Sequence, residues 1–129
     1  MPAVEKTGVI DAGHLTRTYQ AGVAGMKRGT AVMQGADPQH VIPATANAQC
    51  LGLLEEDVIN VGDDCAVRVS GEAVFIAGAV LNAPAYLVSN ATGQLIPSAA
   101  IGDNVIARAV SSIAAIGDYG TAFITPFIR

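Results

Sequence analysis

The chain has 129 residues, enough for one ordinary domain. Charged residues make up only 14% of it, against the roughly 25% typical of soluble domains, and the formal net charge is −4. The seven basic residues are scattered, and aromatic residues are only 5% with no tryptophan. These features argue against nucleic-acid binding, to a duplex or to a single strand. So low a charge suits a protein whose faces are covered by neighbouring molecules.

The first twenty residues are weakly patterned. Their strong apolar positions are only Val9, Ile10 and Leu15. We expect residues 1–20 to form an extended N-terminal arm that becomes ordered on a partner. Residues 21–129 are expected to form a single β-domain. The most apolar window, residues 73–88, is interrupted by glycine, asparagine and proline and is too short to span a bilayer, so no membrane partner is expected.

The rest of the chain has the glycine spacing typical of a β-protein. Glycine recurs at short intervals from residue 22 onward, and short apolar runs lie between the glycines. Several short strands of this kind are typical of a β-sandwich or a β-barrel-like domain. The sustained 3.6-residue period of a helix is absent. Residues 66–70 and 121–125 alternate most clearly, and Gly71 and Glu72 are expected to open a further strand over residues 73–76. The predicted class is all-β.

One stretch of the chain returns later. Residues 30–43 and 84–97 have the same length and match at several apolar positions and at the final proline. The triplet Val-Gly-Asp at 61–63 returns as Ile-Gly-Asp at 116–118. A unit of this size buries too little apolar surface to fold alone, so the copies are expected to share one core. The sequence therefore predicts two pseudo-repeated units, at about residues 25–71 and 79–126.

The sequence contains no residue arrangement typical of an enzyme or a metal centre. His14 and His40 have no metal-ligand spacing. Cys50 and Cys65 are expected to be small packed residues rather than a disulfide or metal ligands. The segment from Gly25 to Thr30 lacks the lysine position of a phosphate-binding loop. We therefore expect no catalytic residue, no cofactor and no metal.

One acidic cluster places five carboxylates in ten residues, at Glu55, Glu56, Asp57, Asp63 and Asp64. It is read as a solvated loop, as a contact to a basic partner surface, or as a calcium site, although the usual calcium-loop spacing is missing. The second unit has Val-Ser-Ser at 110–112, so the fold does not require the acid. The basic pair before residue 30 marks a solvated turn or meets acid on a partner. The candidate partner-contact residues are Val9, Ile10, Leu15, Arg17, Lys27, Arg28, Glu55, Glu56 and Asp57.

The order of glycine, turn and strand signals follows a familiar pattern. The segments that carry it are residues 25–31, 41–44, 51–52, 62–63 and 67–71. Over roughly residues 20–125 the chain resembles the capsid cement, or head decoration, proteins of tailed bacteriophages.

This resemblance implies a β-sandwich or β-barrel-like domain bound to the outside of a capsid, with the major capsid protein as partner. Such a protein would bridge neighbouring capsid subunits, usually as a homotrimer, and so stabilise the shell. It would be found on the capsid exterior of the virion, and in the host cytoplasm during assembly. The family has no catalytic residues to transfer. Two alternatives stay open: another virion component, such as a tail or spike β-module, and a small ligand-binding β-barrel.

Overall fold

The computed structural model describes residues 15–129, and this part of the chain contains nine strands and no helix. The predicted all-β class is confirmed, and no membrane-crossing helix occurs in the described residues. The strands are β2 (Leu15–Ala21), β3 (Ala31–Gln34), β4 (His40–Pro43), β5 (Gly52–Leu54), β6 (Asp64–Ile76), β7 (Ala85–Ser89), β8 (Leu95–Pro97), β9 (Asn104–Ala109) and β10 (Tyr119–Ile128).

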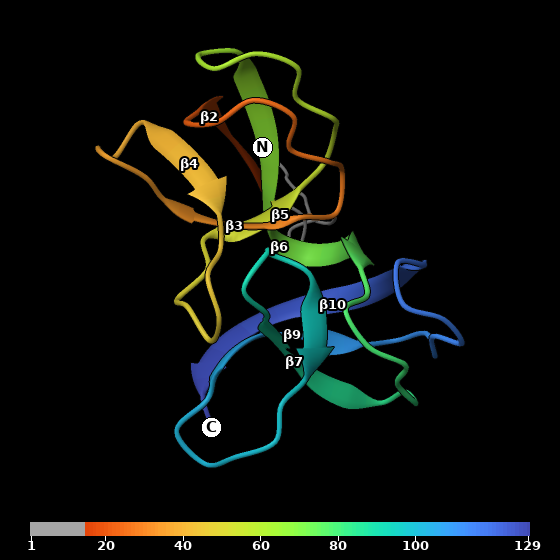
Figure 1. Ribbon diagram of the computed structural model, residues 1–129. Helices are drawn as coiled ribbons and strands as arrows, with labels where there is room; N and C mark the ends of the chain where they lie inside the picture. The colour runs from red at the N-terminus through yellow and green to blue at the C-terminus, as the bar shows by residue number, and fades with distance from the viewer. Residues whose placement is uncertain (1–14) are drawn as a thin grey trace, which may run out of the picture.

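The first four of these strands close into a barrel with the beginning of β6. β4 pairs with β2 and β3, β5 pairs with β3 and β6, and β6 pairs with β2, so the ring of pairings returns to its start. Only the β2–β4 contact is parallel. This first barrel is the upper part of the molecule in Figure 1. Its buried side chains include Val32, Val41, Leu54, Cys65 and Val67.

The last four strands close into a second barrel with the end of β6. β6 pairs with β10, β10 with β9, β9 with β7 and β7 with β8. Ala77, directly after β6, completes the ring through a parallel bridge to Leu95 in β8. The second barrel lies below the first in Figure 1. Its buried side chains include Phe75, Leu81, Leu87, Leu95, Ile106, Ile113 and Ile124.

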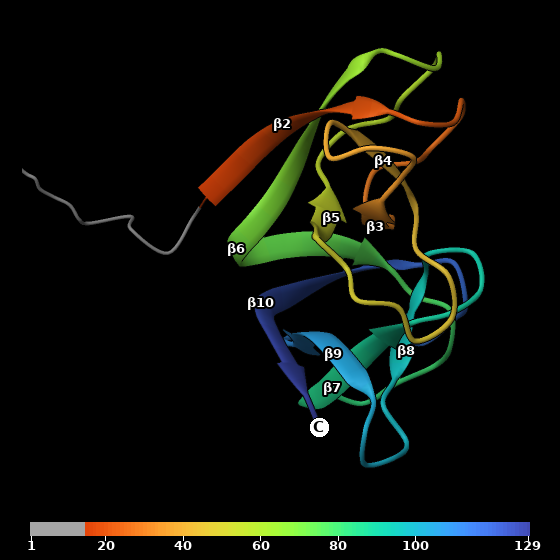
Figure 2. The same cartoon turned by 90° about the vertical axis from the view of Figure 1, so that its left-hand side faces the viewer.

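β6 is therefore shared between the barrels. Its residues 64–70 pair with β2, and residues 71–76 pair with β10. Figure 2 shows the strand running through the upper barrel and then turning along β10. Buried Gly71 lies where the pairing changes and has a φ of +84°, a conformation that glycine adopts without steric cost. The sequence predicted a strand at 66–70 and a further strand opened by Gly71 and Glu72, but the structure has one continuous strand of 13 residues.

The two barrels share one pairing scheme. In the first, Leu54 of β5 lies opposite Val67 of β6, and in the second Ala109 of β9 lies opposite Ala122 of β10. Both residues of the second pair come 55 positions after those of the first. This recurrence in strand pairing supports the predicted pseudo-repeat. The repeat of the two sequence units themselves stays a prediction. The repeat in strand pairing includes β2, which lies before residue 25. β2 occupies in the first ring the place that the end of β6 occupies in the second.

The sequence predicted one core shared by the two units, but the buried apolar residues form two clusters. The larger cluster belongs to the second barrel but includes Ala31, Ala44 and Leu53 of the first. Hydrogen bonds cross the same contact: Ala31 N donates to Gly93 O over 2.8 Å, and Ser89 Oγ donates to Thr45 O over 2.6 Å. The barrels are thus joined by side-chain packing and hydrogen bonds as well as by β6.

Replacing Gly93 by alanine tests this contact, with Gly102→Ala as the matched control. Both glycines have positive φ, +81° and +97°, so each substitution should cost about 1–2 kcal/mol of unfolding free energy in backbone strain. A Cβ at Gly93 would also lie 2.8 Å from Thr30 Cγ2 and 2.9 Å from Ala31 O, whereas a Cβ at Gly102 meets nothing within 4 Å. We expect Gly93→Ala to lose ~1–3 kcal/mol more unfolding free energy than Gly102→Ala, as measured by urea unfolding. Equal losses would contradict close packing between the barrels.

Candidate docking surface

The predicted contact residues of the N-terminal segment lie only partly within the described residues. Val9 and Ile10 lie outside them. The structure places residues 15–20 in β2 rather than in an arm. Leu15 and Arg17 are exposed on this strand, Leu15 with 47% of its surface accessible. Both are therefore available to a partner, on a strand that is already paired with β6.

The acidic cluster after β5 contributes hydrogen bonds within the chain. Arg68 donates to the Glu55 carboxylate from Nε over 3.3 Å and from Nη2 over 3.2 Å. Thr16 Oγ1 donates to the same carboxylate. Asp57 Oδ1 accepts a hydrogen bond from the backbone N–H of Arg28 over 2.8 Å. Two of the predicted contact residues, Glu55 and Asp57, thus have hydrogen-bond partners inside the fold.

The other predicted contact residues near this loop, Lys27, Arg28 and Glu56, are exposed. No group of three histidine, cysteine or acidic residues within residues 15–129 could hold a metal ion. Cys50 and Cys65 are free thiols, half-buried and buried. Burial raises the pKa of both thiols, which keeps them neutral and makes them poor nucleophiles.

The second barrel carries an exposed face that the sequence reasoning missed. Tyr86 of β7, Arg108 of β9 and Phe123 of β10 are neighbours in register, so they form one row across three strands. Tyr86 and Phe123 are each 44% exposed, and Arg108 is exposed between them. The ring of Phe127 meets Tyr86 edge to face, with centroids 5.0 Å apart. We call Tyr86, Arg108, Phe123 and Phe127 the aromatic face.

Two shallow hollows adjoin the aromatic face. One, of about 220 Å³, is lined by Pro84, Ala85, Tyr86 and Arg108. The other, of about 240 Å³, includes Arg28, Glu55, Arg68 and Glu72 in its lining, and it adjoins the row because Phe123 lies opposite Glu72. Both are smaller than the roughly 300–1,000 Å³ typical of small-molecule sites. Aromatic and arginine side chains are enriched in protein–protein contacts, so the surface suits a protein partner better than a small ligand.

The same side of the first barrel is covered. In the shared pairing scheme Tyr86 and Arg108 correspond to Ala31 and Leu53, 55 positions earlier. Ala31 and Leu53 are fully buried, because the second barrel packs on them. The aromatic face therefore occupies the position at which the first barrel makes its inter-barrel contact. On the second barrel this position stays open in the described chain.

A local signal for this face is present in the sequence. Arg108 lies between Ala107 and Ala109, and Phe123 lies between Ala122 and Ile124; all four flanking residues are buried. Since side chains alternate between the two sides of a strand, the middle residue of each triplet must point outward. What the sequence does not supply is the strand register that brings the outward residues together.

The comparison with solved structures concerns this two-barrel fold. The chain is similar to the N base of the head fiber gp8.5 of bacteriophage phi29, with a TM-score of 0.66 and 23% sequence identity. The likeness covers 87% of this chain and 94% of that chain. At this identity it shows that the two proteins share a fold. No protein-family model matches the chain, and no curated protein matches it.

The Glu55–Arg68 pair predicts a pH-dependent stability. Burial raises the pKa of Glu55, but the hydrogen bonds from Arg68 and Thr16 outweigh it and hold the pKa below its ordinary value. A carboxyl with a lowered folded-state pKa stabilises the fold above its unfolded-state pKa, and this contribution is lost as the pH falls through the folded-state pKa. Near neutral pH the unfolding free energy of the wild type should exceed that of Glu55→Gln by up to about 1 kcal/mol, and in acid the two values should converge. Urea unfolding at a series of pH values measures both. Exposed Glu56→Gln is the control, and a pH-independent difference for Glu55→Gln would contradict the pairing.

Proposed function

We propose that the chain is a structural protein of a bacteriophage virion that binds the outer surface of the capsid. The observation that carries the proposal is the fold, which the chain shares over 87% of its length with the base of a phage head fiber. The low charge and the exposed aromatic face support it, because both suit a protein surrounded by other proteins.

The bound protein bridges neighbouring major capsid proteins and thereby stabilises the shell. A protein that binds the assembled shell more tightly than its separated subunits shifts the equilibrium toward the shell by that difference in affinity. Many copies on one particle add their effects. No chemical step is needed for this role.

The aromatic face is the proposed contact between copies of the chain. A second copy that covers this face would repeat, between molecules, the contact that the second barrel makes with the first within one molecule. Such a contact joins different surfaces of the two copies, and a ring of three closes it. Tyr86 and Arg108 belong to the residue types that dominate binding energy at contact centres.

Sedimentation with capsids tests the binding. The purified chain is mixed with expanded, empty capsids of the phage that carries its gene, and the particles are pelleted. We expect saturable co-sedimentation and a higher temperature of capsid disruption in the presence of the chain. Protein that stays in the supernatant with capsids, or that pellets with isolated tails instead, would overturn the capsid assignment.

Size-exclusion chromatography with light scattering tests the self-association. Wild type should elute at three times the monomer mass of 13.1 kDa. Phe123→Ser and Tyr86→Ser should shift the species toward the monomer, since each removes a partly exposed aromatic side chain from the proposed contact. Val80→Ser, at an exposed position outside the aromatic face, is the control. A monomeric wild type would exclude the homotrimer without affecting the capsid assignment.

A further inference from the structure

The loop that leads into β6 is tied to the first barrel at two points. The backbone N–H of buried Val58 donates to Met26 O over 2.8 Å. The N–H of Gly62 donates to Ala21 O over 2.8 Å, and Gly62 has a φ of +88°. These contacts fix the ends of residues 59–63, which we call the first tip.

The loop that leads into β10 is tied to the second barrel in the same way. The N–H of buried Ile113 donates to Leu81 O over 2.9 Å. The N–H of Gly117 donates to Ala77 O over 2.8 Å, and Gly117 has a φ of +92°. Residues 114–118, the second tip, are thus held in the conformation of the first tip on the other barrel.

Each tip exposes a large aliphatic side chain at the same position. Val61 is 63% exposed and Ile116 is 68% exposed, and each precedes the glycine of its tip. An aspartate follows the glycine in both tips, at Asp63 and Asp118. One exposed aliphatic residue on a protein surface is ordinary. Here the exposed aliphatic residue recurs at one position of a recurring loop, and neither barrel packs on it.

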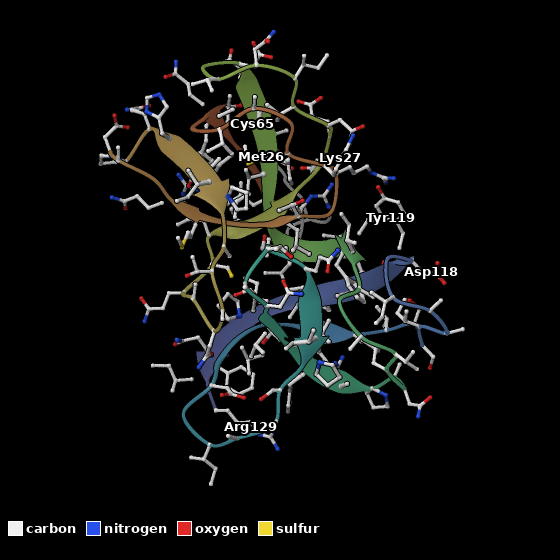
Figure 3. The ribbon with its side chains drawn as sticks, viewed as in Figure 1. Met26, Lys27, Cys65, Asp118, Tyr119 and Arg129 are labelled. Carbon is white, nitrogen blue, oxygen red and sulfur yellow. The ribbon has the colours of Figure 1, made fainter. Side chains whose placement is uncertain are left out.

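The strand β6 sets the distance between the tips. It begins directly after the first tip and ends beside the second, where Ala77 N donates to Asp118 O over 2.9 Å. Thirteen residues of strand span at most about 40 Å, less the bend at Gly71. Figure 3 shows the two positions apart, with Cys65, next to the first tip, in the upper barrel and Asp118 at the edge of the lower one. Because β6 is paired along its length, the separation is fixed.

We propose that the two tips bind two equivalent pockets on neighbouring capsid subunits, each pocket apolar with a basic residue at its rim. The aliphatic side chain enters the pocket, and the aspartate two residues later meets the basic rim. The negative net charge of the chain and the acidic residues around the first tip complement such a rim. The inference rests on the proposed function and names the contacts that perform the bridging.

Capsid sedimentation with substituted tips tests the inference. We compare wild type with Val61→Ser, Ile116→Ser and the double variant by competition against labelled wild type. Each single substitution should weaken binding on the order of tenfold, and the two losses should be alike because the tips are equivalent. The double variant should bind on the order of a hundredfold more weakly or worse, because it has lost both of the linked contacts. Circular dichroism and light scattering establish that each variant keeps the wild-type fold and assembly.

The matched control is Ile128→Ser. Ile128 is 65% exposed, between the values of the two tip residues, but it lies at the end of β10 outside both tips, so its substitution should leave binding unchanged. Asp118→Asn should weaken binding at low salt and reduce its salt dependence, since it removes the charge that meets the basic rim.

The outcomes separate the two proposals. Wild type that fails to pellet with capsids overturns the proposed function, and the tip assignment with it. Wild type that pellets while both tip variants behave like Ile128→Ser overturns the tip assignment alone. A loss from only one of the two single substitutions overturns the two-site contact.

Discussion

The dual pairing of β6 is the interaction on which the rest of the structure depends. One half of this strand closes the first barrel, and the other half opens the second. Neither ring of hydrogen bonds is complete without it, and closure leaves few free strand edges. The two core clusters, the contact between the barrels and the separation of the two tips all follow from the position of this strand. Gly71 makes the arrangement possible, because its left-handed backbone lets the strand change partners without ending.

The distribution of aromatic residues separates the interior of the protein from its surfaces. The cores are filled mainly by leucine, valine, isoleucine and alanine, and Phe75 is the aromatic side chain that is fully buried among the described residues. Tyr86, Phe123 and Phe127 instead gather on one outward side of the second barrel. In a chain with only 14% charged residues, the surface offers large apolar groups where most proteins offer lysine and glutamate. This composition is consistent with a protein that works among other proteins.

Local features of the sequence predicted much of the fold. The alternating strands at 66–70 and 121–125 lie where expected, because period-2 alternation is a local signal. β2 was missed because its exposed positions are filled by Thr, Arg and Gln, which carry little apolar signal. The aromatic face was missed because its residues come from three strands and meet only through register, which no local pattern encodes. The acidic cluster was visible in sequence, but its hydrogen bonds to Arg68 and to the Arg28 backbone were not.

The orientation of β6 between the tips has a mechanical consequence. If subunits of an expanding shell pull on the two tips, the force runs lengthwise along this strand. Its hydrogen bonds to β2 and β10 lie across the strand, so such a pull stretches them together in shear rather than opening them one after another. A ladder loaded in this direction resists rupture far better than one peeled from its end. The fold would then act as a tie whose strength comes from the hydrogen bonds of β6 on both sides of Gly71.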